Sequence, residues 1–154
     1  MSKHQEIPDS IEKAMQLQAS FLIEAFSAEE SPIDGTKLDF SKSSLMLVDQ
    51  ILRDFHIEEA VLPDDLHLIT SCYVFETLRQ SLGGHYLRSD SPNDFVLILG
   101  EPDCQIVCLV MERVWACAQN WEPNRLVIFY EDIEEALRQK KNVHVGAVTE
   151  ARPD

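Results

Sequence analysis

The sequence lacks the marks of membrane, secreted and cofactor-binding proteins. No apolar run is long enough to span a membrane, and the polar first residues hold no apolar segment of a signal peptide. A Walker loop, a Rossmann glycine fingerprint, an HExxH motif and the GxSxG turn of hydrolases are all missing. We therefore expect a cytoplasmic protein without a cofactor.

Positive charge is also scarce. Against 27 acidic residues stand 13 Lys and Arg, so the formal net charge is −14. Nucleic-acid and anionic membrane surfaces are bound by clustered basic residues, and this chain has no such cluster. The charge excludes nucleic acid and membranes as expected partners. It is compatible with a basic protein partner, although solubility alone also accounts for it.

The chain has four cysteines, and their spacing favours neither a disulfide bond nor a zinc site. Cys104 and Cys108 lie four positions apart, which in a strand separates their Cα atoms by about 13 Å. A disulfide needs a Cα separation below about 7 Å. No CxxC pair and no zinc-type spacing of Cys and His is present. The sequence predicts four reduced thiols, including Cys72 and Cys117, and no metal site.

Three amphipathic segments open the chain. Apolar residues at helical spacing predict helices over residues 9–27, 41–55 and 64–82. The expected N-terminal caps are Asp9, Ser41 and Asp64. The third helix is apolar on nearly every side, which is typical of a helix at the centre of a fold.

The only paired glycines, Gly83 and Gly84, follow the third helix. A phosphate-binding loop has the reverse order, with its glycines between a strand and a following helix. Gly83 stands where helices commonly end in a residue with positive φ, which glycine adopts without a Cβ clash. We interpret the pair as a helix end that leads into a strand at residues 85–88.

Short apolar runs then alternate with turns. The runs at 95–100 and 104–110 predict two strands, with a turn at 89–94 before the first, and short connections favour antiparallel pairing. A helix is expected over 111–120, and 142–148 is a candidate edge strand. Residues 126–130 alone resemble a strand, but the apolar spacing from Leu126 to Leu137 favours a helix over 123–140.

These elements predict one α+β domain over residues 1–154. Three N-terminal helices pack on a small antiparallel sheet of three or four strands, and the C-terminal helices close the domain. Residues 1–8 and 149–154 are polar and are expected to be flexible ends.

Three segments carry a resemblance. They are "LDFSKSSLMLVDQIL", "CYVFETLRQSLGGHYL" and "NWEPNRLVIFYEDI". Their order and spacing, over residues 38–135, resemble a family of small bacterial single-domain proteins of unknown function. The resemblance implies an α+β fold and no particular activity. The family carries other large residues at the positions of His85 and Tyr86, so no catalytic role is transferred to them.

A few residues are candidates for chemistry or binding. Glu76 lies at the edge of an apolar helix face, where burial can raise a carboxyl pKa, but pairing with Arg79 or Arg113 is the alternative. His85 is a weak catalytic candidate that needs a tertiary partner, such as a nearby Ser or Cys. The candidate binding aromatics are Trp115, Trp121 and Tyr86.

These features favour a non-enzymatic protein that binds another protein, as an adaptor does. Two alternatives remain. One is an immunity-type inhibitor of a basic toxin, in which the acidic surface speeds association. The other is a small hydrolase or ligand-binding protein with a pocket near Glu76 and His85.

Overall fold

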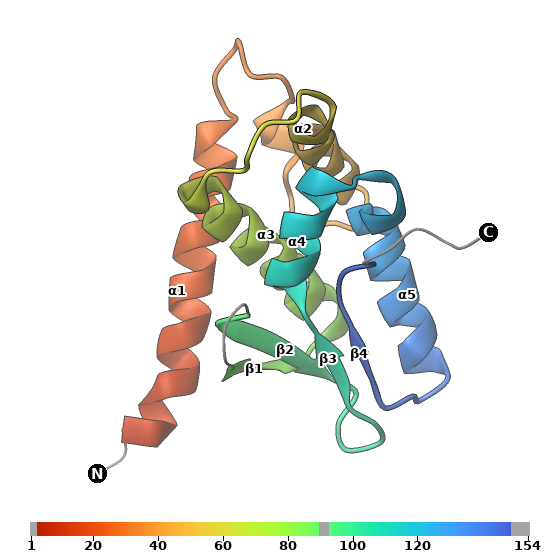
Figure 1. The fold of residues 1–154 in the computed structure, drawn as a ribbon. Coiled ribbons are helices and arrows are strands. Elements are labelled where there is room, and N and C mark those ends of the chain that lie inside the picture. Colours follow the sequence, from red (N-terminus) through yellow and green to blue (C-terminus); the bar gives the residue numbers. More distant parts are fainter. Residues whose placement is uncertain (1–2, 90–92, 149–154) are drawn as a thin grey trace, which may run out of the picture.

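The third helix forms the centre of the molecule. The computed structural model describes residues 3–89 and 93–148, which form five α-helices and a four-stranded sheet. Helix α3 (Asp64–Leu82) lies against α1 (Lys3–Ala25) on one side and α4 (Val110–Gln119) on the other (Figure 1). Its residues 70–78 are all buried, as expected for a helix that is apolar on most faces.

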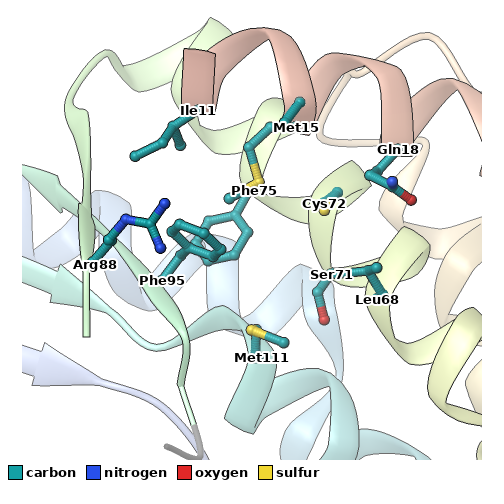
Figure 2. Close-up of a pocket in the computed structure, with 11 residues that line it drawn as sticks. Ile11, Met15, Gln18, Leu68, Ser71, Cys72, Phe75, Arg88, Phe95 and Met111 are labelled. Carbon is teal, nitrogen blue, oxygen red and sulfur yellow. The ribbon is translucent and has the colours of Figure 1, made fainter. Parts of the chain in front are cut away.

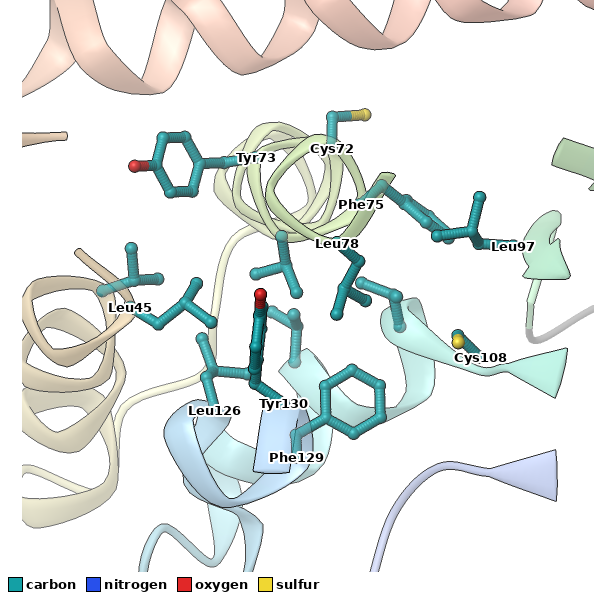
Figure 3. Close-up of a cluster of buried hydrophobic side chains, with 14 of the residues drawn as sticks. Leu45, Cys72, Tyr73, Phe75, Leu78, Leu97, Cys108, Leu126, Phe129 and Tyr130 are labelled. Atoms are coloured by element: carbon teal, nitrogen blue, oxygen red, sulfur yellow. The ribbon is translucent and has the colours of Figure 1, made fainter. Parts of the chain in front are cut away.

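The other helices complete the core around α3. Helix α2 (Leu45–Ile57) packs on α4 and on α5 (Leu126–Arg138). Figure 3 shows α3 end-on, with core side chains of α2, α5, β2 and β3 converging on it. The fully buried residues there include Tyr73, Leu78, Leu97 and Phe129. Among the described residues, no helix has the length and hydropathy needed to cross a membrane.

The sheet has the order β1–β2–β3–β4. Strands β1 (His85–Arg88), β2 (Phe95–Leu99) and β3 (Ile106–Cys108) form the expected antiparallel meander. The edge strand β4 (Val143–Val145) was also expected, but it pairs with β3 in parallel. A parallel neighbour requires a crossover, which α4, the 3-10 turn η2 (Glu122–Asn124) and α5 supply.

The fold class is therefore confirmed as α+β, with a sheet of mixed rather than purely antiparallel strands. Residues 126–130 are helical, as the longer window predicts. The predicted start of that helix at residue 123 is wrong, because Arg125 is extended (φ −56°, ψ 143°) and separates η2 from α5. Part of the predicted turn, residues 90–92, lies outside the described residues.

The predicted helix caps differ from the structure. Helix α1 begins at Lys3, not at Asp9, and it continues through Pro8 at the loss of one backbone hydrogen bond. Ser41 accepts a 3.1 Å bond from the Ser44 amide in a turn before α2, but the helix starts at Leu45. Pro63 takes the cap position of α3, and Asp64 is its first residue, so its carboxylate still faces the positive helix end.

Helix α3 ends where the glycines predict. Gly83 has φ 88° and Gly84 has φ 94°, both in the region that favours glycine. The ψ of Gly83 is −149°, however, so the helix ends in a more extended backbone than the expected left-handed one. Of the expected flexible ends, residues 3–8 belong to α1, whereas 1–2 and 149–154 lie outside the described residues.

Candidate functional site

Glu76 is completely buried and is held by three side chains. Arg79, one turn later on α3, donates from Nε to Oε2 (2.8 Å) and from Nη2 to Oε1 (2.9 Å). The Tyr86 hydroxyl, on β1, donates to Oε2 at 2.6 Å. The side-chain amide of Gln80 donates from Nε2 to Oε1 of Glu76 at 3.4 Å. Burial alone raises the pKa of Glu76, but the bonds from Arg79 and Tyr86 outweigh it and hold the pKa below its usual value.

This arrangement gives Glu76 a structural role as an ion-paired anchor between α3 and β1. Arg79, and not Arg113, is its partner. Tyr86 is also buried, and its ring packs edge-on against Phe75 with the ring centres 5.4 Å apart. Tyr86 therefore faces the interior and does not form an exposed binding surface.

His85 lies on the opposite face of β1 from Tyr86, because successive strand residues point to opposite sides. It is half exposed, and its Nε2 lies 3.8 Å from Oε1 of Glu101. The structure therefore does not bring His85 to Glu76. No hydrogen bond joins it to Ser71 or Cys72 either, so the nucleophile–base pairs considered from the sequence are not formed among the described residues.

The two tryptophans lie at different hollows on the surface. Trp121 donates from its indole N–H to the Asp49 carbonyl (3.1 Å), and the guanidinium carbons of Arg53 and Arg125 each lie 5.4 Å from its ring centre. Trp115 packs against His67, with ring centres 5.6 Å apart, and lines a second hollow between α4 and the segment 55–62. The two rings do not form one continuous surface.

Asp49 was not singled out from the sequence. Its carboxylate is buried at the start of α5 and accepts hydrogen bonds from the amides of Leu126 (2.7 Å) and Val127 (3.4 Å). Asp49 thus caps a helix that lies far away in the chain. Burial raises its pKa to about 6, against the opposing effect of these two bonds.

Arg113 is also buried, but its partners are backbone carbonyls and not Glu76. Its guanidinium donates to the carbonyls of Asn124 (2.9 Å), Gly146 (2.9 Å) and Arg125 (3.0 Å), and lies 4.9 Å from the Phe129 ring centre. Burial lowers its pKa. Arg113 ties α4 to the turn before α5 and to the backbone that follows β4. A charged residue within an apolar helix stripe was the sequence signal for it.

A cavity of about 300 Å³ lies where α1, α3, β1, β2 and the first turn of α4 meet (Figure 2). Its volume falls at the lower end of the range for small-molecule sites, and its walls are mostly apolar, as those sites are. The apolar side chains that line it include Ile11, Met15, Leu68, Phe75, Phe95 and Met111.

Three polar residues, Arg88, Gln18 and Ser71, are among those that line the cavity. Figure 2 shows Arg88 on one side and Ser71 with Leu68 on the other, with the rings of Phe75 and Phe95 between them. The Arg88 guanidinium carbon lies 5.4 Å from the Phe95 ring centre. Ser71 is fully buried, and its hydroxyl has no hydrogen-bond partner among residues that the structure describes. An unpaired buried hydroxyl costs about 1–3 kcal/mol.

The thiol beside Ser71 is unreactive by its environment. Burial, together with the charge of Glu76, raises the pKa of Cys72 to about 12, so it stays protonated near neutral pH. Cys72, Cys104, Cys108 and Cys117 are all buried and unpaired. Across residues 3–89 and 93–148, no group of three His, Cys, Asp or Glu side chains is placed to hold a metal ion.

The cavity was missed from the sequence, because its walls combine α3, β1 and β2 with α1 and α4, which lie elsewhere in the chain. The run Thr70–Ser71–Cys72 was the one local signal, since it places small polar side chains within an otherwise apolar helix. No protein-family model, curated protein or solved structure matches this chain. The resemblance of residues 38–135 to a bacterial family stays a prediction.

Proposed function

We propose that this protein is a non-enzymatic binding protein that takes a small, largely apolar molecule into the cavity between α1, α3 and the sheet. The observation that carries the proposal is a cavity of about 300 Å³ whose wall is mostly apolar and includes Ile11, Met15, Phe75 and Phe95. An apolar site with few polar groups is the usual form of a ligand pocket. Burial of the ligand's apolar surface supplies the affinity.

The environment of the cavity supports binding rather than chemistry. The Cys72 thiol stays protonated, and Ser71 has no base within hydrogen-bond reach among the described side chains. His67, one turn before Ser71, directs its Nε2 to the Met111 carbonyl at 2.8 Å. A nucleophile without a neighbouring base is a poor catalyst, so we assign the cavity no reaction.

Octanol, a neutral apolar probe, tests this proposal. We expect it to bind the full-length protein in calorimetry and to shift amide signals of α1 and α3 in NMR spectra. Ala14 is an exposed residue of α1 that lines the cavity, so Ala14→Trp should cover the entrance and abolish octanol binding in both measurements. Gln16→Trp is the matched control, because Gln16 is exposed on the same helix and does not line the cavity.

The outcomes separate clearly. Binding that persists in Ala14→Trp, or that Gln16→Trp abolishes equally, places the probe elsewhere and overturns the proposal. A second pair of variants, at Ser71 and Thr70, tests the wall of the cavity. Thr70 and Ser71 both have fully buried, unpaired hydroxyls in the described chain, but only Ser71 lines the cavity. Ser71→Leu should block octanol, whereas Thr70→Val should not.

A second candidate function is docking of a basic protein segment at the hollow beside Trp115. Ile57 and Val61, which line this hollow, are 57% and 77% exposed, so they offer apolar surface to a partner. Acidic residues surround them in the chain: Glu58, Glu59, Asp64 and Asp65. Apolar anchors within negative charge suit a partner segment that carries both Lys or Arg and a large apolar side chain.

A synthetic amphipathic Lys/Leu peptide tests the docking surface, with a Glu/Leu peptide as the charge control. We expect the basic peptide to bind, to shift the Trp115 indole signal and to bind more weakly at high salt. Val61→Ser should weaken it, whereas Leu87→Ser, a change at an exposed apolar residue of β1, should not. Equal binding of the two peptides would rule this candidate out.

A further inference from the structure

We propose that the cavity selects apolar molecules that carry a carboxylate, and that Arg88 binds this carboxylate. The inference rests on the proposed function, because it names the ligand class of the same cavity. Its structural basis is the position of Arg88, the one charged residue among those that line a mostly apolar cavity in the described chain (Figure 2).

Arg88 is the last residue of β1, so its main chain is fixed by the pairing with Phe95 on β2. The ring of Phe95 lies under the guanidinium, with 5.4 Å from its carbon to the ring centre. This contact directs the long side chain along the cavity wall and leaves the edges of the guanidinium, which carry its N–H groups, open to a ligand. The planar fork of N–H groups matches the two oxygens of a carboxylate.

Arg88, like Arg53 and Arg125, lacks an ion pair among the described residues, and it differs from them in lining the cavity. The chain has 27 acidic residues against 13 Lys and Arg, so carboxylates are abundant. Arg79, the preceding arginine, is paired with Glu76. Arg88 forms no ion pair with any side chain that the structure describes. A guanidinium at an apolar cavity is thus available to an anionic group brought by a ligand.

The size of the cavity bounds the rest of the ligand. A volume of about 300 Å³ holds roughly ten groups of the size of a water molecule. A carboxylate with an apolar chain about as long as that of octanoate fits this estimate.

Three probes that differ only in the head group test the inference: octanoate, octanol and octylamine. We expect octanoate to bind about fivefold more tightly than octanol, which is the gain of one solvent-accessible ion pair, and octylamine to bind most weakly. Arg88→Gln should lower octanoate affinity to that of octanol and leave octanol affinity unchanged. Both affinities are measured by calorimetry on the folded full-length protein.

Arg53→Gln is the matched control. Arg53 is an arginine over an aromatic ring at the same 5.4 Å distance, but it lies beside Trp121 and not at the cavity. It should leave all three affinities unchanged. A parallel loss of octanoate binding in Arg53→Gln would mean that net charge alone attracts the ligand, which overturns the inference.

The remaining outcomes distinguish this inference from the proposed function. If octanol and octanoate bind the parent protein equally, Arg88 does not select the head group, and the cavity remains a site for apolar molecules. If Arg88→Gln loses octanol as well, Arg88 only maintains the wall, and the inference is wrong. If none of the probes binds, the proposed function itself fails.

Discussion

The Tyr86 hydroxyl donates a 2.6 Å hydrogen bond to Oε2 of Glu76, and both groups are buried. This bond joins β1 to α3 at the point where Arg79 neutralises the carboxylate. Tyr86→Phe removes one donor and leaves Glu76 paired, so we expect it to lower the free energy of unfolding by about 1–3 kcal/mol.

Glu76→Gln should cost more, about 3–5 kcal/mol, because it leaves the largely buried Arg79 charge without its counter-ion. Urea denaturation at neutral pH measures both variants. A Glu76→Gln protein as stable as the parent would mean that the pair is not a structural anchor. Because the pKa of Glu76 is held below its usual value, its stabilising contribution is present above the unfolded pKa of 4.5 and declines as the pH falls through the folded value.

Asp49 should show the opposite pH dependence. Its folded pKa of about 6 exceeds the unfolded value of 3.8, so the folded state holds the proton more tightly. A pKa difference of about 2 is equivalent to about 3 kcal/mol. As the pH rises from about 4 to 6, the parent protein should therefore lose about 3 kcal/mol of stability relative to Asp49→Asn. The amide oxygen of this variant can still accept the hydrogen bond from the Leu126 amide. Urea denaturation of both proteins across this range measures it; a constant difference would contradict it.

The two glycines after α3 should not be equally replaceable. A Cβ on Gly84 would lie 2.5 Å from the Ile98 carbonyl oxygen, whereas a Cβ on Gly83 has open space around it. Gly83→Ala should therefore cost only the backbone strain of a φ and ψ that are essentially restricted to glycine, about 1–3 kcal/mol. Gly84→Ala adds a clash with β2 and should cost clearly more. Thermal melts of the two variants compare them directly, and an equal loss would mean that β2 moves away without cost.

Arg113 should tolerate no shorter or neutral replacement. Arg113→Met keeps much of the volume over Phe129 but leaves the carbonyls of Asn124, Arg125 and Gly146 without their donor. We expect a loss of more than about 3 kcal/mol, because several buried acceptors become unpaired at once. Arg113→Lys should restore only part of it, since one ammonium lacks the planar fork. Denaturation midpoints rank the three proteins; a fully stable Met variant would contradict the role.

Local pattern predicted most of the fold, because helical spacing reflects which face is buried. The spacing from Leu126 to Leu137 correctly assigned α5 although "LVIFY" resembles a strand. The direction of β4 could not be predicted in this way. The sequence of a three-residue edge strand does not determine whether it pairs in parallel or antiparallel. The direction of β4 depends on the position of the end of α5 relative to β3.

The functional candidates were harder to predict than the elements. Pairing of Glu76 with Arg79 follows from their spacing of three on one helix, and the sequence included it among the alternatives. The cavity depends on a gap between faces that are each apolar, and periodicity identifies faces but not the spaces between them. Asp49 and Arg113 satisfy backbone groups far away in the chain, so no local signal names their partners.

The parallel pairing of β4 with β3 has a consequence for how the chain folds. The strands β1, β2 and β3 are neighbours in the sequence and can pair locally. In the sequence, β4 is separated from β3 by α4 and α5, so its pairing with β3 is a non-local contact. Such a non-local contact is entropically expensive and forms late. Until β4 has joined, the edge of β3 is unpaired, and an unpaired strand edge can pair with another chain.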